Sequence, residues 1–250
     1  MTNKPAGFRP STGKLWLIVG TAAVVLLLAG CQSMAGGGGP DAQRVAEQLQ
    51  KSSSGDGQEL SQIQTKLVEG ALSLHGSSRL KVKGRSFNAD CTGTVMAIYW
   101  HAGIDLGSPI SEYRGNGVTR LYHFLEDEGA LYETRRPKPG DIIFWDNTYD
   151  RNKDGQPNDY LTHTGMVVSV EEDGTLHFVH HNYRKGVVLA RMNLYKPEVY
   201  TELVDGQQQV VNSPMRMRGS PEFNKWLASE LTRSFGRAWE VVDKSAFLGG

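Results

Sequence analysis

Cys91 is the residue of this chain whose type and surroundings most clearly suggest chemistry. It follows Asp90, a residue type that often caps the N-terminus of a helix, and it precedes a helical stripe of apolar residues, Val95, Ile98 and Ala102. A thiol in the first turn of a helix lies beside unpaired backbone N–H groups and the positive end of the helix dipole, which stabilise a thiolate. The pattern therefore predicts a nucleophile at Cys91, the alternative being a small apolar residue of the core.

A cysteine nucleophile needs a base, and histidine is the usual one. Of the seven histidines, three fall within or at the ends of predicted helices, where surface or capping roles are commoner: His75, His101 and His123. His163 instead begins a β-rich run, which can place its imidazole beside the start of the cysteine helix. His180 alternates with Leu176 and Phe178 and so shares their apolar face. It is either a core histidine or the third member of the site.

A second candidate site precedes His163. Its oxygen-bearing residues follow the spacing at the start of a calcium-binding loop, with Gly155 at the sharp turn: Asp150, Asn152, Asp154 and Asn158. Leu161 stands at position twelve, where the usual ligand is a bidentate glutamate, and Asp159 is the candidate to replace it. A polar loop that binds no metal is the equal alternative. The sequence thus suggests a structural calcium ion.

The periodicity of the chain predicts the elements that position these residues. Apolar residues recur at helical spacing over 60–74, from Cys91 onward and over 118–125, whereas residues 140–145, 164–170, 175–181 and 186–192 are rich in strand-forming types. Short turns separate the last three runs, which indicates an antiparallel meander. Helices followed by a meander predict an α+β fold with segregated layers. A further helical stretch is expected from Glu222 to Glu240.

The N-terminus has the pattern of an export signal. Three basic residues precede an apolar stretch over 15–30, which ends in Leu-Ala-Gly before Cys31 and so resembles a bacterial lipobox. Cys31 is therefore expected to carry lipid, the alternative being a single membrane-spanning anchor. Gln32 stands where an aspartate would retain a lipoprotein in the inner membrane. We expect an outer-membrane lipoprotein that faces the periplasm.

Composition and charge define the expected domains. Removal of residues 1–30 leaves 24 basic and 27 acidic residues, a formal charge of −3, so no nucleic-acid partner is indicated. Residues 31–60 are rich in glycine and serine and predict a flexible tether. A globular domain is expected over 61–205 and a helical extension over 206–250. With Cys31 lipidated, Cys91 has no partner for an intrachain disulfide.

Five segments in a fixed order resemble the NlpC-type cell-wall cysteine peptidases and the related CHAP amidase/peptidase domains. They are Leu67–Gly76 (LVEGALSLHG), Asp90–Val95 (DCTGTV), Lys138–Trp145 (KPGDIIFW), His163–Val168 (HTGMVV) and Phe178–His180 (FVH). The resemblance covers roughly residues 62–195. It implies a papain-like core with the nucleophile at a helix start, packed on the meander, and hydrolysis of amide bonds in peptidoglycan stem peptides. It implies no cofactor for catalysis.

The same resemblance assigns roles to individual residues. Cys91 would be the nucleophile, His163 the general base and His180 the residue that orients the imidazole, with the backbone N–H of Cys91 stabilising the oxyanion. In the CHAP-like register Asn182 is the alternative orienting residue. The loop 78–84 departs from the family pattern of a tyrosine and a glycine pair, so the substrate pocket is expected to differ.

Two other functions remain open from the sequence. An N-acetylmuramoyl-L-alanine amidase would use the same residues and cut a different bond. A catalytically silent wall-binding lipoprotein would use the fold alone, although the intact Cys91, His163 and His180 favour an enzyme.

Overall fold

The computed structural model describes Met1 and residues 60–216 and 225–242. The predicted signal peptide, the predicted lipobox with Cys31 and nearly all of the predicted tether therefore lie outside the described residues. None of the helices within the described ranges is long and apolar enough to cross a membrane.

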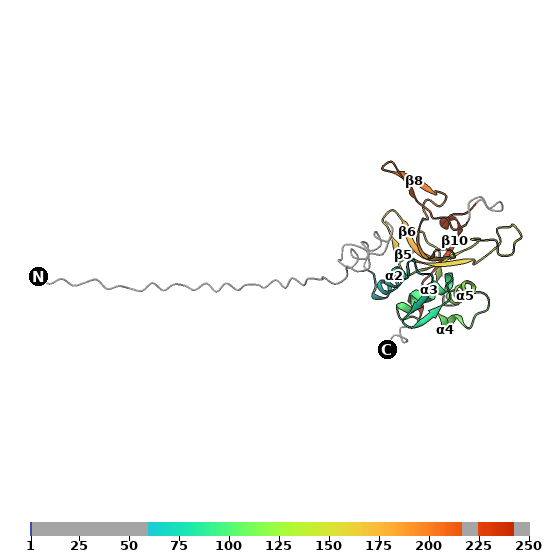
Figure 1. Cartoon of the computed structure of the whole chain (residues 1–250), viewed down its shortest axis with the longest axis horizontal. Coiled ribbons are helices and arrows are strands. Elements are labelled where there is room, and N and C mark those ends of the chain that lie inside the picture. Colours follow the sequence, from blue (N-terminus) through green and yellow to red (C-terminus); the bar gives the residue numbers. More distant parts are fainter. Residues whose placement is uncertain (2–59, 217–224, 243–250) are drawn as a thin grey trace. The chain divides into compact units, whose positions relative to one another are not determined.

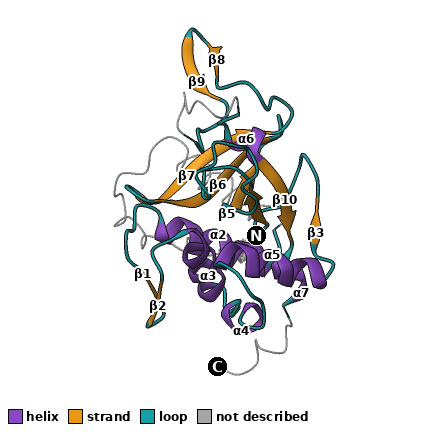
Figure 2. Ribbon diagram, turned by 90° about the vertical axis from the view of Figure 1, so that its right-hand side faces the viewer, coloured by secondary structure: helices purple, strands orange, loops and turns teal. Residues whose placement is uncertain are grey.

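Helices form one layer of the domain, as Figure 2 shows. They are α2 (Gln62–Leu74), α3 (Cys91–His101), α4 (Gly107–Ile110) and α5 (Gly117–Asp127), and the β1–β2 hairpin (Leu80–Val82 and Arg85–Phe87) lies between α2 and α3 in the sequence. Ser61 closes a capping box with Gln64 at the start of α2, and Asn116 caps α5. The helices predicted from Cys91 and over 118–125 are confirmed.

A six-stranded antiparallel sheet forms the other layer. Its strand order is β3 (Leu131–Tyr132), β10 (Thr232–Gly236), β4 (Ile142–Trp145), β5 (His163–Val170), β6 (Thr175–Asn182) and β7 (Gly186–Asn193). Strands β5 to β7 form the predicted meander, and β4 pairs antiparallel with β5. The predicted α+β class is confirmed. A separate hairpin, β8 (Thr201–Val204) and β9 (Gln207–Val210), projects from the sheet (Figure 1).

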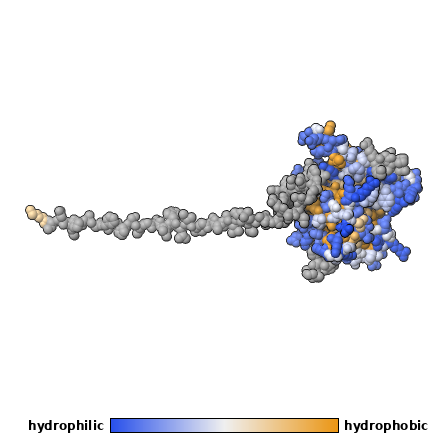
Figure 3. Space-filling model, in the orientation of Figure 1, coloured by the Kyte–Doolittle hydropathy of each residue, from blue (hydrophilic) through white to orange (hydrophobic). Residues whose placement is uncertain are grey.

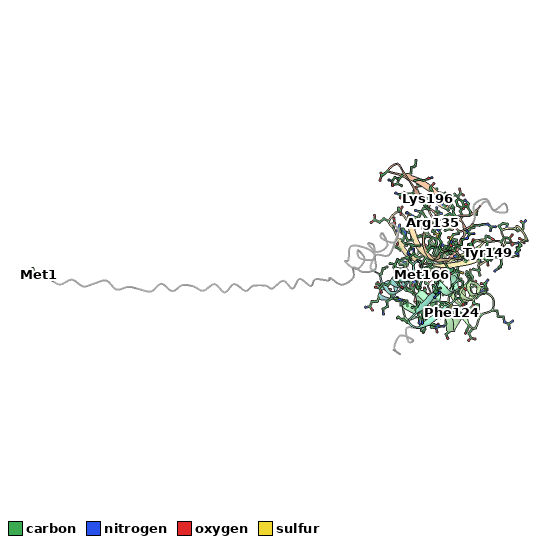
Figure 4. The ribbon with its side chains drawn as sticks, in the orientation of Figure 1. Met1, Phe124, Arg135, Tyr149, Met166 and Lys196 are labelled. Atoms are coloured by element: carbon green, nitrogen blue, oxygen red, sulfur yellow. The ribbon has the colours of Figure 1, made fainter. Side chains whose placement is uncertain are left out.

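Both faces of the sheet are buried, which allows strands to carry long apolar runs. Met166, Val168 and Val179 face α2, α3 and α5 in the larger core, and Figure 4 places Met166 between the two layers. The opposite face has its own cluster, in which Trp145 and Phe178 pack with residues of the C-terminal segment. The surface in view in Figure 3 is mostly hydrophilic, with an apolar tip on the β8–β9 hairpin, where Leu203 is exposed.

The prediction of a helix from Glu222 to Glu240 is wrong. In place of one helix, the described part of this segment forms α6 (Ala228–Leu231), β10 and α7 (Ala238–Val241). Strand β10 pairs with β4, where Phe235 lies opposite Ile143 and both side chains are buried. Apolar residues here satisfy a helical period locally, but pairing with the open edge of β4 buries them more fully. The C-terminal segment therefore belongs to the same sheet as His163.

Candidate active site

The start of α3 holds Cys91 against the start of β5. Asp90 caps the helix, because its Oδ1 accepts a hydrogen bond of 2.7 Å from the Gly93 N–H. A Cβ atom at Gly93 would lie only 2.0 Å from the carbonyl oxygen of Asn88, so only glycine permits this approach of the preceding loop. Local packing thus explains the glycine of the Asp-Cys-Thr-Gly sequence.

The Cys91 thiol is half-buried and is hydrogen-bonded to Thr92 on α3 and to the backbone of Thr164 on β5. Burial and the nearby Asp90 carboxylate raise its pKa, and hydrogen bonds from the backbone of Thr164 and from Thr92 oppose this rise. The net effect is a raised pKa, so the resting sulfur is a thiol at neutral pH. The contact with Thr164 brings the sulfur to the residue that follows His163.

His163 and His180 are in direct contact across β5 and β6. Nε2 of His163 lies 3.0 Å from Nδ1 of His180, and the two rings are nearly perpendicular. The rings rest on aromatic side chains, with Trp145 beside His163 and Phe178 beside His180. One imidazole therefore fixes the orientation of the other, and the aromatic residues limit the movement of both.

The environment keeps both imidazoles neutral. Burial, followed by the neighbouring His180 and His181, holds the pKa of His163 well below its usual range. Burial likewise lowers the pKa of His180 to about 4. A neutral His163 can accept a proton, and its Nδ1 is not used in the contact with His180. Among the described residues no hydrogen bond joins the Cys91 sulfur to the His163 ring; such bonds often tighten only when substrate binds.

Asn182 occupies a different position. Its side-chain oxygen accepts hydrogen bonds from the backbone N–H groups of Arg184 (3.0 Å) and Lys185 (3.1 Å), and so it organises the turn between β6 and β7. The structure therefore brings His180, rather than Asn182, to the ring of His163. The sequence pattern did not indicate that Thr92, Thr164 and Trp145 contact the proposed catalytic residues. Thr92 adjoins the nucleophile, but a backbone contact such as that of Thr164 leaves no signal in the sequence.

The loop before β5 gathers four of its five candidate ligands. Nδ2 of Asn152 donates to Asp154 and to Asn158, each at 3.0 Å, while the Asp150 carboxylate accepts from the backbone N–H groups of Lys153 and Gly155. Asp159 lies apart. Its side chain is buried and accepts a hydrogen bond from the backbone N–H of Arg151.

The proposed replacement of the missing glutamate by Asp159 therefore does not fit this structure, because its carboxylate is engaged inside the fold. Within the described residues no group of three or more His, Cys, Asp or Glu side chains is arranged to hold a metal ion. Calcium binding stays a prediction that rests on Asp150, Asn152, Asp154 and Asn158.

Calcium at about 100 times its dissociation constant is expected to raise the melting temperature of the protein by about 5 °C, because it binds only the folded loop. The measurement is a melting curve in chelator and in calcium for the wild type and for Asp150→Asn/Asp154→Asn, which should not respond. Asp205→Asn, in the turn between β8 and β9, is the control and should respond like the wild type. If calcium does not change the melting temperature of the wild type, the prediction is wrong and the loop binds no metal.

One comparison with known proteins gives a match, to a protein family. Residues 82–182 match the model of a family described as the CHAP domain. No curated protein and no solved structure matches the chain. CHAP domains are typically peptidoglycan hydrolases, so the match supports an enzyme that acts on the bacterial cell wall. The match covers less than half of the chain, and the matched region contains the helix of Cys91 and the strands of His163 and His180.

Proposed function

We propose that this protein hydrolyses amide bonds in peptidoglycan stem peptides, with Cys91 as nucleophile, His163 as general base and His180 as the residue that orients the base. The observation that carries the proposal is the 3.0 Å contact between His163 and His180, next to a thiol that is bonded to the backbone of Thr164. These groups come from three elements inside the region that matches the CHAP domain.

The electrostatics favour general-base catalysis from a neutral pair. Nε2–H of His163 donates to Nδ1 of His180, which leaves the lone pair on Nδ1 of His163 to accept the thiol proton as the sulfur attacks the carbonyl carbon. The N–H of Cys91 at the helix start stabilises the oxyanion. His163 then gives its proton to the leaving amine, and water hydrolyses the thioester with His163 again as base. The mechanism requires the thiol and the imidazole to meet when substrate binds.

The bond that is cut distinguishes a peptidase from an amidase. We propose cleavage within the stem peptide; cleavage between N-acetylmuramic acid and L-alanine, by an N-acetylmuramoyl-L-alanine amidase, is the alternative on the same residues. Purified sacculi digested with the chain lacking residues 1–59 should release fragments that mass spectrometry identifies as cut within the peptide. Glycan strands freed of whole stem peptides would indicate the amidase, and intact sacculi would favour the silent wall-binding protein.

We also propose that lipid on Cys31 tethers the enzyme to the periplasmic face of the outer membrane. The support is the apolar stretch that ends in Leu-Ala-Gly-Cys, with Gln32 after it. In cells fed labelled palmitate, the wild type is expected to incorporate label, while Cys31→Ser incorporates none and remains uncleaved. Cys91→Ser is the matched control and should be labelled normally. Equal labelling of Cys31→Ser would exclude the lipoprotein.

A further inference from the structure

The C-terminal segment, outside the region that matches the CHAP domain, contacts the strand end that leads into His163. The Arg233 guanidinium on β10 donates from Nη1 to Oδ2 of Asp146 at 2.8 Å. The other carboxylate oxygen of Asp146 accepts the backbone N–H of Leu161 at 2.7 Å. One carboxylate thus joins β10 to a residue two positions before His163.

Leu161 needs this support because of its backbone conformation. Its φ of 53° lies in the left-handed region, which a branched side chain rarely adopts, while its side chain is buried in the helix-facing core. The next residue, Thr162, donates its N–H to the carbonyl of Trp145 at 2.9 Å. A strained turn that is hydrogen-bonded at two successive residues sets the direction in which β5 begins, and so the position of His163.

The C-terminal segment also holds the Trp145 ring that lies beside the His163 imidazole. Nε1 of Trp145 donates to the carbonyl of Ala228 at 2.9 Å, and the backbone N–H of Asp146 donates to the carbonyl of Leu231 at 3.1 Å. The Trp145 ring lies beside His163. Both the strand that carries the base and the aromatic ring behind it are therefore attached to residues 228–233.

From these contacts we infer that Arg233 is a positioning residue for the base His163, acting through Asp146 and the strained Leu161. The guanidinium is itself held in place, because it lies over the rings of Tyr122 and Tyr160. This inference rests on the proposed function, in which His163 must meet the thiol within a few tenths of an ångström of the productive geometry. Displacement of a catalytic group by about 1 Å costs on the order of 10²-fold in rate.

The test compares Arg233→Met with Arg237→Met in the full chain. Arg237 is a matched control, because it is also 35 % exposed, forms one ion pair, with Glu240, and lies over a tyrosine ring, but does not contact the turn before His163. Arg233→Met should lower kcat about tenfold with little change in KM, and Arg233→Lys, which keeps one charged donor for Asp146, should restore most of it. Arg237→Met should leave kcat unchanged.

A readout that does not depend on activity is the NMR signal of the His163 ring, assigned by its loss in His163→Gln. It should move in Arg233→Met and in Asp146→Asn, and stay in place in Arg237→Met. The double variant Arg233→Met/Asp146→Asn should be no worse than either single variant, because both remove the same link. The inference is overturned if Arg233→Met leaves both kcat and the His163 signal unchanged. A wild type without hydrolytic activity would refute the proposed function instead, and the NMR comparison would still decide the role of Arg233.

Discussion

Replacement of Cys91 by alanine should lower the rate of stem-peptide hydrolysis at least about 10³-fold, because no other nucleophile can form the thioester. The fold should survive. The side chain is only half-buried, and the cap that Asp90 provides for α3 does not involve the thiol. The measurements are the release of fragments from sacculi and the melting temperature of the same preparation.

Cys91→Ser is the companion variant. It preserves the side-chain shape and the hydrogen bonds with Thr92 and Thr164, but a hydroxyl gives up its proton far less readily than a thiol, so activity should be lost as well. Hydrolysis at the wild-type rate by either variant, with an intact fold, would show that Cys91 is not the nucleophile.

Replacement of His180 by glutamine should lower kcat by about 10²-fold, because the imidazole of His163 loses the partner that fixes its tautomer and orientation. Asn182→Ala should reduce kcat much less, since that side chain organises the β6–β7 turn. The comparison of kcat for the two variants decides whether His180 or Asn182 orients the imidazole of His163. A larger loss in Asn182→Ala than in His180→Gln would reverse the assignment.

The pH profile provides a second check on the same pair. Because the folded protein holds the pKa of His163 well below its usual range, the wild type should remain active below the ordinary histidine pKa of about 6.5 and lose activity only as His163 becomes protonated. Repulsion between the two imidazoles when both are protonated is one cause of this lowering, after burial. In His180→Gln the acid limb of kcat/KM should therefore move to higher pH, toward the ordinary value.

Short-range sequence patterns predicted the start of α3 and the antiparallel meander correctly. Asp90 before Cys91 indicated where the helix begins, and the runs of β-branched and aromatic residues separated by short turns indicated the meander of β5 to β7. These features depend on neighbours a few residues apart, through capping, side-chain periodicity and turn chemistry. The order of the DCTGTV, HTGMVV and FVH segments was sufficient to indicate the family that residues 82–182 match.

Other parts depended on contacts between distant residues. The sequence left His180 and Asn182 both open as partners of His163. The register of β5 against β6, with Gly165 opposite His180, decided that the side chain of His180 lies beside His163. Likewise, apolar residues over 222–240 predicted a helix, yet part of this segment became β10 because the edge of β4 was open to pair with it. Strand pairing and burial are set by the whole domain, so the local period could not reveal that Arg233 meets Asp146, 87 residues away.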